Sequence, residues 1–421
     1  MKQYESQFRK LTEVGTVNRG KSKHRPRNAP ELYGGSYPFI QTGDVKHANF
    51  YITEYVQTYS EKGLAQSKLW QPGTLCITIA ANIADTAILK IPACFPDSII
   101  GFIPEKGKSE VRFIKYCLDT YKKEMQLISQ GTTQDNLSQG KLLSLRFRIP
   151  DYDQQQKIAA ILSAYDELIE NSQRRIALLE KMAEEIYREW FVRLRFPGHK
   201  KIKLESRPLR DFVQEYIGGD WGEDMQGSKF ANPVYVIRGT DFEGVLQGNI
   251  SSVPLRYVKD SSLRSRKLRV GDLIVENSVN HQSRTAGKSL LITQHLLDLF
   301  DGDAICASFC KLIRPKNTKH SKLLSLNFRL LFEQGLFEYF QNVATNGIAN
   351  LQAERLLDRH LIFFHENIDL QILDSFDTSL LARVQANLRQ TRDQLLPRLI
   401  SGKLAVEHLD IRFPPGMEDR P

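Results

Sequence analysis

Residues 136–143 read NLSQGKLL and residues 350–357 read NLQAERLL, so this chain of 421 residues contains one short motif twice. The copies lie 214 residues apart (350 − 136), about half the chain length. In each copy, an isoleucine 15 residues after the last leucine, Ile158 or Ile372, opens a long charged stretch. Weaker matches precede the motif in the same order: FIQTGD at 39–44 with VIRGTD at 236–241, and LWQPGTL at 69–75 with LRVGDL at 268–273. This order predicts two similar domains and two similar helices, and hence a partner or substrate with approximate twofold symmetry.

Each half is predicted to be a mixed α+β domain of roughly 150–170 residues. Residues 35–104 and 233–315 contain short apolar, β-branched runs separated by Gly, Pro, Asn and Asp, which is typical of strands. Amphipathic helices are predicted over 111–129 and 322–342, and short strands follow the repeated motif at 145–149 and 360–364.

A long helix is predicted from residue 153 to about residue 193, because this stretch contains neither Pro nor Gly. Its positions 158, 162, 165, 169, 172, 176, 179, 183, 186 and 190 alternate steps of four and three, and nine of these ten are apolar, with Ser172 the exception. A seam of this length favours a coiled coil. Forty residues would form a rod of roughly 60 Å, which the sequence Pro197-Gly198 ends.

A second long helix is predicted from residue 368 to about residue 400, with a less regular seam at 373, 376, 380, 384, 388, 391, 395 and 399. Pro397 is expected to kink or stop it in the last turn. If the second domain folds back between the two helices, they pair antiparallel and set a fixed distance between the domains. Alternatively, the same apolar seams form a helix bundle with an external partner.

The composition is that of a soluble globular protein, with 41% hydrophobic and 25% charged residues. The N-terminus contains no apolar run for a signal peptide, and no segment approaches the length of a membrane helix. The five cysteines include no Cys-x-x-Cys pair, which disfavours structural zinc and a disulfide framework and fits a reducing cytoplasm. Cys306 and Cys310 are expected in the core.

The formal net charge of +9 is compatible with a polyanionic partner. One basic cluster, at residues 19–27, contains six basic residues, His24 included, and no acidic residue. A second basic cluster spans residues 256–269. Two such patches in duplicated domains favour contact with phosphates over ordinary solvated loops.

The sequence contains none of the common catalytic motifs in complete form. Gly287-Lys288-Ser289 resembles the end of a phosphate-binding loop, but the first glycine of that motif would be residue 282, which is Gln, so Gly287 is expected to be a turn residue. Ser138 and Lys141 have Ser-x-x-Lys spacing, but the second copy has Gln352 and Arg355 there. His360 and His365 have no acidic or Cys partner at metal-ligand spacing, which favours packing. The chain is therefore predicted to be non-enzymatic.

The whole chain resembles the specificity subunits (HsdS family) of type I restriction-modification systems. The resemblance is clearest in IPDYDQQQKIAAIL at 149–162 and DELIENSQRRIALLE at 166–180, which are similar to the central region of that family. LLPRLISGKL at 395–404 resembles the family's C-terminal ending, and GTTQDNL at 131–137 resembles its usual loop before the strand.

The resemblance implies two similar mixed α/β target recognition domains, separated by two long helices that pair as an antiparallel coiled coil. The expected divisions are recognition domain 1 at 1–150, a central helical spacer at 151–197, recognition domain 2 at 198–366, a distal helical spacer at 367–402 and a tail at 403–421. It also implies that the chain binds double-stranded DNA, docks two methyltransferase subunits and joins endonuclease/translocase subunits. S-adenosylmethionine and catalysis are then expected on the methyltransferase partner, with no cofactor and no metal on this chain.

Each domain is expected to hold phosphates with basic loops and to contact bases with polar side chains between them. The loop at 218–224 is acidic where the equivalent loop of the first copy is basic, so the two half-sites are expected to differ and the target to be asymmetric. The candidates in the first domain are Arg19, Lys21, Lys23, Arg25, Arg27 and Gln134. Those in the second are Asn280, His281, Gln282, Arg284, Lys288 and Asn346, for which a solvated loop is the alternative. The candidate partner-binding residues on the helices are Arg174, Arg175, Glu180, Arg389 and Arg392.

Two alternatives remain at the level of the sequence: a coiled-coil scaffold that assembles proteins without contacting DNA, and a nuclease or methylase with an unrecognised site. The DNA sequence recognised, its spacer length and the choice between restriction and modification alone do not follow from the residues.

Overall fold

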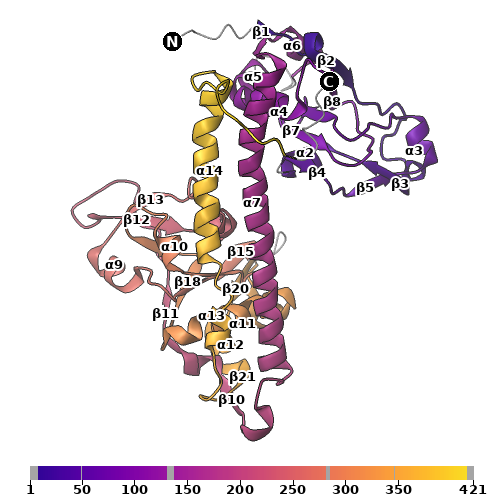
Figure 1. The fold of residues 1–421 in the computed structure, drawn as a ribbon. Helices are drawn as coiled ribbons and strands as arrows, with labels where there is room; N and C mark the ends of the chain where they lie inside the picture. Colours follow the sequence, from indigo (N-terminus) through magenta and orange to yellow (C-terminus); the bar gives the residue numbers. More distant parts are fainter. Residues whose placement is uncertain (1–7, 49, 130–136, 281–284, 346, 415–421) are drawn as a thin grey trace. The chain divides into compact units, whose positions relative to one another are not determined.

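The computed structural model describes residues 8–48, 50–129, 137–280, 285–345 and 347–414, and Figure 1 traces the chain. The chain divides into two compact units. The first unit comprises Met1–Ile169 and Leu388–Pro421, and the second unit comprises Glu170–Asn387. Each of the two long helices contributes one part to each unit. The finer division into domains, spacers and tail that the sequence suggests remains a prediction.

A five-stranded sheet forms the centre of the first unit. Its strands lie in the order β2 (Gly15–Arg19), β8 (Ile99–Pro104), β6 (Leu75–Thr78), β7 (Thr86–Leu89) and β4 (Tyr51–Ile52). Neighbouring strands are antiparallel, except for β4 and β7, which are parallel. β6 is buried at all four of its residues, as expected for a short apolar run at the centre of a sheet. The strands β3 (Tyr33–Phe39) and β5 (Gln57–Tyr59) form a separate antiparallel pair.

The helix predicted over 111–129 is two helices, α4 (Val111–Thr120) and α5 (Lys122–Ser129). Phe113, Ile114, Cys117 and Leu118 share one face of α4 and pack into the same core cluster as the strands β6, β7 and β8. Shorter elements complete this unit: α1 (Leu11–Val14), α2 (Thr42–His47), α3 (Glu61–Ala65), α6 (Gln139–Ser144), and the paired strands β1 (Phe8–Arg9) and β9 (Phe147–Arg148).

The described part of the second unit contains a four-stranded sheet, two three-stranded sheets and one pair of strands. The four-stranded sheet has the order β11 (Val213–Gly218), β18 (Cys310–Pro315), β14 (Leu273–Glu276) and β16 (Ser289–Leu291). The other sheets are β13 (Leu255–Val258), β12 (Asn232–Ile237) and β17 (Ala304–Cys306), then β15 (Ser278–Asn280), β20 (Ile348–Leu351) and β19 (Gln341–Val343). The pair is β10 (Glu205–Pro208) with β21 (Leu361–Phe364).

The helices of the second unit are α8 (Phe242–Leu246), α9 (Asp260–Arg266), α10 (Gln294–Leu297), α11 (Ser321–Glu333), α12 (Ala353–Arg359) and α13 (Gln371–Asp374). The helix predicted over 322–342 ends at Glu333, because Gly335 adopts a φ of +68° and a separate 3-10 turn, Leu336–Phe340, follows. Cys306 and Cys310 lie in the core of this unit, as predicted.

Equivalent hydrogen bonds confirm that the two units are copies. Gln41 N–H donates to Asp44 Oδ2 over 2.7 Å, and Arg238 N–H donates to Asp241 Oδ2 over 2.9 Å. The next repeated motif behaves alike, since Gly73 N–H donates to a carbonyl of β7's last residue and Gly271 N–H donates to the carbonyl that follows β16. The short sequence matches therefore mark residues that form equivalent hydrogen bonds in both units.

The first long helix, α7, runs from Tyr152 to Tyr187 and continues as a π-helical turn at Arg188–Val192. All ten seam positions predicted for it are buried or half-buried. The polar exception, Ser172, is 8% exposed, so the seam is continuous through it. The alternation of four and three was therefore a correct guide to the buried face of α7.

The seam predicted for the second long helix is wrong at three positions. The predicted start at residue 368 is wrong as well, because α13 ends at Asp374 and the long helix, α14, spans only Ser379–Ile400. The side chains of Leu380 and Val384 on α14 are 70% and 43% exposed. Thr391 is exposed as well. A continuous stripe of half-buried and buried positions runs instead through 381, 385, 388, 392, 395 and 399, again with steps of four and three. Gln385 and Arg392 are polar, so a search for apolar residues alone selected a neighbouring stripe.

Within the first unit the two long helices run antiparallel. Ile158 and Leu399 line one small crevice, and further along Asp166 on α7 forms an ion pair with Arg392 on α14. Residue numbers therefore rise along α7 as they fall along α14. Leu395 and Leu396 pack against the core that contains Ile158 and Leu162.

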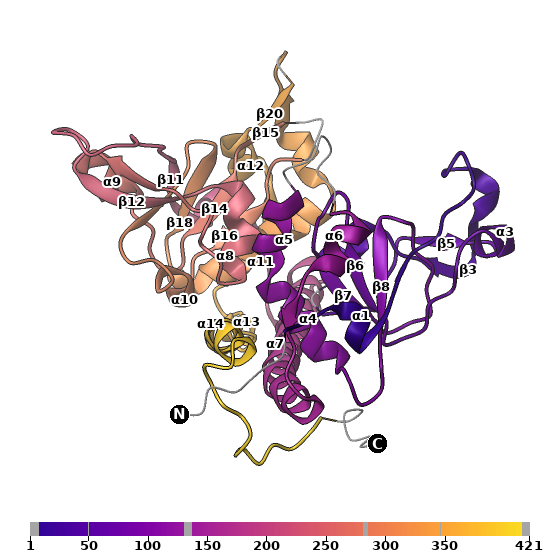
Figure 2. The ribbon, with the colours of Figure 1, turned by 90° about the horizontal axis from the view of Figure 1, so that it is seen from above.

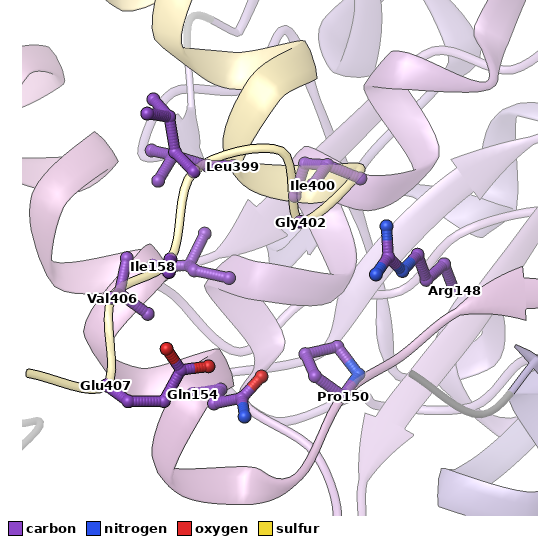
Figure 3. Close-up of a pocket in the computed structure, with 11 residues that line it drawn as sticks. Arg148, Pro150, Gln154, Ile158, Leu399, Ile400, Gly402, Val406 and Glu407 are labelled. Atoms are coloured by element: carbon purple, nitrogen blue, oxygen red, sulfur yellow. The ribbon is translucent and has the colours of Figure 1, made fainter. Parts of the chain in front are cut away.

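The C-terminal segment after α14 closes over this end of the first unit (Figure 3). Val406 is 2% exposed, and Lys157 Nζ donates to the Glu407 carbonyl over 2.7 Å. The crevice that remains has a volume of about 20 Å³, which is space for a water molecule and not for a ligand. The segment is thus part of the domain core.

Candidate nucleic-acid interface

The repeated motif is anchored at the same place in both units, at the end of a central strand. Leu137 N–H donates to the carbonyl of Ile79, just after β6, over 3.0 Å. Leu351 N–H donates to the carbonyl of Asn277, just after β14, over 2.7 Å. The motif therefore fixes a polar surface region to one end of each central sheet.

In the first unit this region contains a cavity of about 340 Å³. Its lining is Arg19, Arg27, Ile79, Ala80, Asp97, Ser98, Leu137, Ser138 and Gln139. Arg27 Nη2 donates to Asp97 Oδ2 over 2.9 Å, and Arg19 Nε donates to the Asp97 carbonyl. A guanidinium has five N–H donors, so both arginines are held in place and keep donors for a ligand. Two cations and one carboxylate give the cavity a net positive charge.

The structure brings together Arg19 and Arg27 but not the rest of the basic cluster. Arg25 Nη1 donates to the carbonyls of Ser22 and His24, over 2.7 and 2.8 Å, and so stabilises its own loop. Lys21 and Lys23 are exposed and form no ion pair with a described residue. Gln134 lies outside the described residues.

A glycine holds the start of this loop in each unit. A Cβ on Gly20 would lie 2.2 Å from the Pro96 carbonyl oxygen, and a Cβ on Gly219 would lie 2.0 Å from the Ala307 carbonyl oxygen. Only glycine permits this close approach of two backbones. The two loops that follow, one basic and one acidic, therefore begin from equivalent positions.

The two aspartates of the second loop, Asp220 and Asp224, form contacts within the domain. Burial raises the pKa of Asp220, but hydrogen bonds from Ser262 and from the N–H groups of Gly222 and Trp221 lower it below the ordinary value. Asp224 pairs with Arg256, whose guanidinium lies 4.8 Å from the Trp221 ring centroid. Two of the three acids of this loop are thus held by internal contacts, whereas the Glu223 side chain is exposed.

The second basic cluster is also largely engaged in internal contacts. Arg266 Nε donates to the Gly218 carbonyl over 2.7 Å, Lys267 pairs with Asp303 at 2.6 Å, and Arg264 pairs with Asp260 at 2.9 Å. Arg256 is only 9% exposed. The geometry therefore does not favour contact of the whole cluster with phosphates. Arg269 is exposed and is the member better placed for such a contact.

In the second unit, the candidates Asn280 and Lys288 both lie near the end of β14. Asn280 ends β15 and is paired with Ile348 of β20, and the Lys288 carbonyl accepts a hydrogen bond from Glu276 N–H over 2.8 Å. Figure 2 shows β15 and β20 extending from the rest of this unit. His281, Gln282, Arg284 and Asn346 lie outside the described residues, next in the chain to these elements. Gly287, predicted to be a turn residue, has a φ of +111°.

One polar face in this region was missed from the sequence. On the sheet of β15, β20 and β19, the residues Ser278, Asn350 and Asn342 are register partners. Ser278 Oγ donates to Asn350 Oδ1 over 2.6 Å, and beside them Phe309 is 64% exposed. Asn350 belongs to the repeated motif, and its position in that motif was the signal available in the sequence.

The candidate partner-binding residues on the long helices differ in whether their charged groups are already paired within the chain. Arg174 is exposed and forms only an i,i+4 pair with Glu170 at 3.8 Å among the ion pairs of the described residues, and Arg175 is exposed. Glu180 pairs with Arg329 on α11 at 3.2 Å, so its carboxylate already has a partner. Burial and the nearby Arg392 lower the pKa of Arg389. Burial opposes the charge of Arg392, but Asp166 and Asp393 raise its pKa.

Ser138 and His360 have structural contacts. Ser138 Oγ accepts a hydrogen bond from Lys141 N–H over 3.2 Å and so caps α6. His360 packs near Asn327, and burial lowers its pKa. Across the part of the chain that the structure describes, no cluster of His, Cys, Asp and Glu could hold a metal ion, and no helix is long and apolar enough to cross a membrane.

Comparison with known proteins gives one consistent result. Residues 3–181 match the family model described as the type I restriction modification DNA specificity domain. The type I restriction enzyme MjaIX specificity subunit of Methanocaldococcus jannaschii is 24% identical over 430 aligned positions, covering 95% of this chain and 94% of that subunit. The crystal structure of the S subunit of a type I restriction-modification system from M. genitalium has the same fold, with a TM-score of 0.57 at 12% identity, over 95% of this chain and 97% of that one. The repeated α+β units, the long helices and these matches agree: residues 3–181 match a type I restriction-modification DNA specificity domain, and the whole chain is similar to the specificity subunits of such systems.

Proposed function

We propose that this chain selects the DNA sequence on which a type I restriction-modification enzyme acts. Each unit contacts one half of a bipartite, asymmetric site in double-stranded DNA. The long helices set the spacing between the half-sites and dock two methyltransferase subunits, which endonuclease/translocase subunits join. The chain itself is non-catalytic, and S-adenosylmethionine binds the methyltransferase partner.

One observation carries this proposal: equivalent sheet ends of the two units present different polar groups. The first unit presents Arg19 and Arg27 around a cavity, and the second presents the hydroxyl and amides of Ser278, Asn342 and Asn350. Guanidinium groups suit phosphates and guanine edges, whereas amides suit other base edges. Two copies of one scaffold with different donors at the same place are what an asymmetric DNA site requires.

Exposed apolar side chains on the long helices support a docking role for them. Leu178 and Met182 on α7 are 59% and 45% exposed, and Leu380 and Val384 on α14 are exposed as well. Apolar residues at helical spacing on a solvated face are typical of a protein interface.

The decisive experiment is selection of DNA by the assembled complex. The chain would be purified with its methyltransferase subunits and incubated with a randomised duplex library. Methylome sequencing of a host that carries the genes would identify the same site independently. The expected result is one bipartite motif with unlike halves. Binding without sequence preference, or no DNA binding by the assembled complex, would favour a protein scaffold instead.

The role of the first unit is tested by Arg27→Gln. This change removes one cation from the cavity, so affinity should fall, and the slope of log affinity against log salt should decrease by about one. Lys106→Gln is the matched control, because Lys106 is exposed and follows the opposite end of β8 from Asp97 and Ser98. Equal effects of the two substitutions would exclude Arg27 from the interface.

A further inference from the structure

We infer that the second unit recognises its half-site with the face formed by Ser278, Asn342 and Asn350, and that Asn350 acts there as a hydrogen-bond donor of fixed orientation. This inference rests on the proposed function and names the residues that determine specificity in one half of the site. The chemical group recognised is a hydrogen-bond acceptor on a base edge, such as the N7 of a purine.

A chain of hydrogen bonds fixes the Asn350 amide. Asn277 Nδ2 donates to Ser278 Oγ over 3.1 Å, and Ser278 Oγ donates to Asn350 Oδ1 over 2.6 Å. A serine hydroxyl has one proton, which is used in the second bond. The carbonyl oxygen of Asn350 is therefore occupied, and its amide N–H groups are the part available to a ligand.

Strand register places the other members on the same face. Asn350 is the partner of Ser278 on β15 and of Asn342 on β19, and directly paired residues point to the same side of a sheet. The adjacent registers place Val279, Ala349 and Val343 together on the opposite face, where Val279 and Ala349 are buried. The sheet thus has one face toward the core and one polar face.

The dimensions of this sheet match the major groove. Three strands spaced about 4.8 Å apart span roughly 10 Å between the outer strands. The major groove is about 12 Å wide and the minor groove about 6 Å wide. Acceptors such as purine N7 lie in the major groove, so the width and the donor chemistry lead to the same groove.

Phe309 adds an apolar group beside the polar face. Its carbonyl accepts hydrogen bonds from Asn277 N–H and Ser278 N–H, over 2.8 and 3.1 Å, and its side chain is 64% exposed. The equivalent residue in the first unit is Ser98, since its carbonyl accepts from Ile79 N–H over 2.9 Å. Ser98 lines the open cavity there, whereas Phe309 offers an apolar contact, for example to a thymine methyl group.

The test is Asn350→Asp in the complex with methyltransferase subunits. An aspartate still accepts the Ser278 hydrogen bond, so the fold is preserved while the outward donor becomes an acceptor. Selection from the randomised duplex library should change at one position of one half-site only. Affinity for the original site should fall about tenfold or more.

Asn249→Asp is the matched control, because it adds the same negative charge to the same unit. Asn249 Oδ1 accepts from Ser251 N–H over 3.0 Å and from its hydroxyl over 2.7 Å, and an aspartate keeps both bonds. This control should keep the selected sequence and lose little affinity. If N350D selects the original sequence and loses no more affinity than N249D, the inference is wrong.

Two further variants keep the outcome clear. Ser278→Ala frees the Asn350 amide to rotate. The half-site position that N350D changes should then tolerate bases with either a donor or an acceptor, while overall affinity for DNA changes little. Asn342→Asp, on an exposed residue, tests the face if N350D does not assemble, and an unchanged selected sequence would then overturn the inference. A wild-type complex that selects no sequence would refute the proposed function itself, which is a different result from any of these.

Discussion

At the scale of single residues, long-range ion pairs decide which charges remain available to DNA. Arg314 illustrates a structural cation: its Nε and Nη2 donate to the two carboxylate oxygens of Asp272, over 3.0 and 2.9 Å, and Nη1 pairs with Glu215. Arg314 is 6% and Asp272 1% exposed. The pair holds β18 to the start of β14, whose other end presents the proposed reading face.

We expect Arg314→Ala to destabilise the second unit by about 3–5 kcal/mol, because it leaves the Asp272 carboxylate buried without its cation. The measurement is chemical unfolding of the purified chain. The double variant with Asp272→Ala as well should lose less than the sum of the two single changes, since it leaves no buried charge. Additive losses would show that the two groups do not interact.

Asp241 predicts an acid-sensitive step in the same unit. Burial raises its pKa, but Arg238, bound through both carboxylate oxygens at 2.9 Å, and Ser252 lower it below the ordinary value of 3.8. A carboxyl group whose pKa is lower in the folded chain stabilises the fold above the unfolded pKa, and this stability is lost as pH falls through the folded pKa. Asp241→Asn should therefore cost about 2 kcal/mol at neutral pH and weaken the loss of stability below about pH 4.

The control for Asp241 is Asp260→Asn. Asp260 forms an exposed i,i+4 pair with Arg264, with side chains 71% and 76% exposed, so its loss should cost under about 0.5 kcal/mol. Stability would be followed by thermal unfolding from pH 3 to pH 7. An acid profile of D241N that parallels the wild type would contradict the assignment.

At the scale of elements, the buried stripe of α14 is the point where sequence periodicity misled. Gln385 is 4% exposed although it is polar, while the apolar Leu380 is 70% exposed. A polar residue enters a buried stripe when it has specific partners there, as Arg392 does with Asp166. The exposed apolar residues are then left for a partner subunit under the proposed function.

Leu399→Ala and Leu380→Ala separate these two stripes. Leu399 is 3% exposed in the core of the first unit, so its truncation should cost about 2–4 kcal/mol. Leu380→Ala should change stability by less than about 0.5 kcal/mol and should instead weaken assembly with the methyltransferase subunits. Unfolding experiments and size-exclusion chromatography of the mixed subunits measure the two effects. A larger loss of stability for L380A would restore the stripe predicted from sequence.

At the scale of the whole molecule, the two units share their chain through the long helices. The first unit is completed by the second part of α14 and the residues that follow it, and the second unit begins within α7. The first unit is therefore discontinuous in the chain, and the second unit, Glu170–Asn387, is inserted between its two segments. Under the proposed function, the helices then act as a ruler between two independent recognition surfaces.

Insertion of one heptad into each long helix tests the ruler. Seven residues lengthen a helix by about 10 Å, which corresponds to roughly three base pairs of DNA. The selected half-sites should keep their sequences while the spacing between them increases. Library selection with the assembled complex measures both properties, and an unchanged spacing would exclude the ruler.

The sequence by itself determined the duplication, the α+β class, the two long helices and the buried face of α7. These are local or periodic features: a strand run, a helix without Pro or Gly and a heptad seam depend on neighbours within a few residues. The matched hydrogen bonds of Asp44 and Asp241 show that even short repeated motifs carried reliable structural information.

Only the tertiary structure decided which polar side chains face outward together. Asp224 lies 32 residues from Arg256, and Ser278 lies 72 residues from Asn350, so their pairing follows from the sheet and not from local pattern. Asp224 of the acidic loop and Arg256 of the second basic cluster form an ion pair, which sequence charge could not reveal. The repeated motif is anchored by its leucine at the sheet end, and its asparagine in the second unit lies on the surface that we propose contacts DNA.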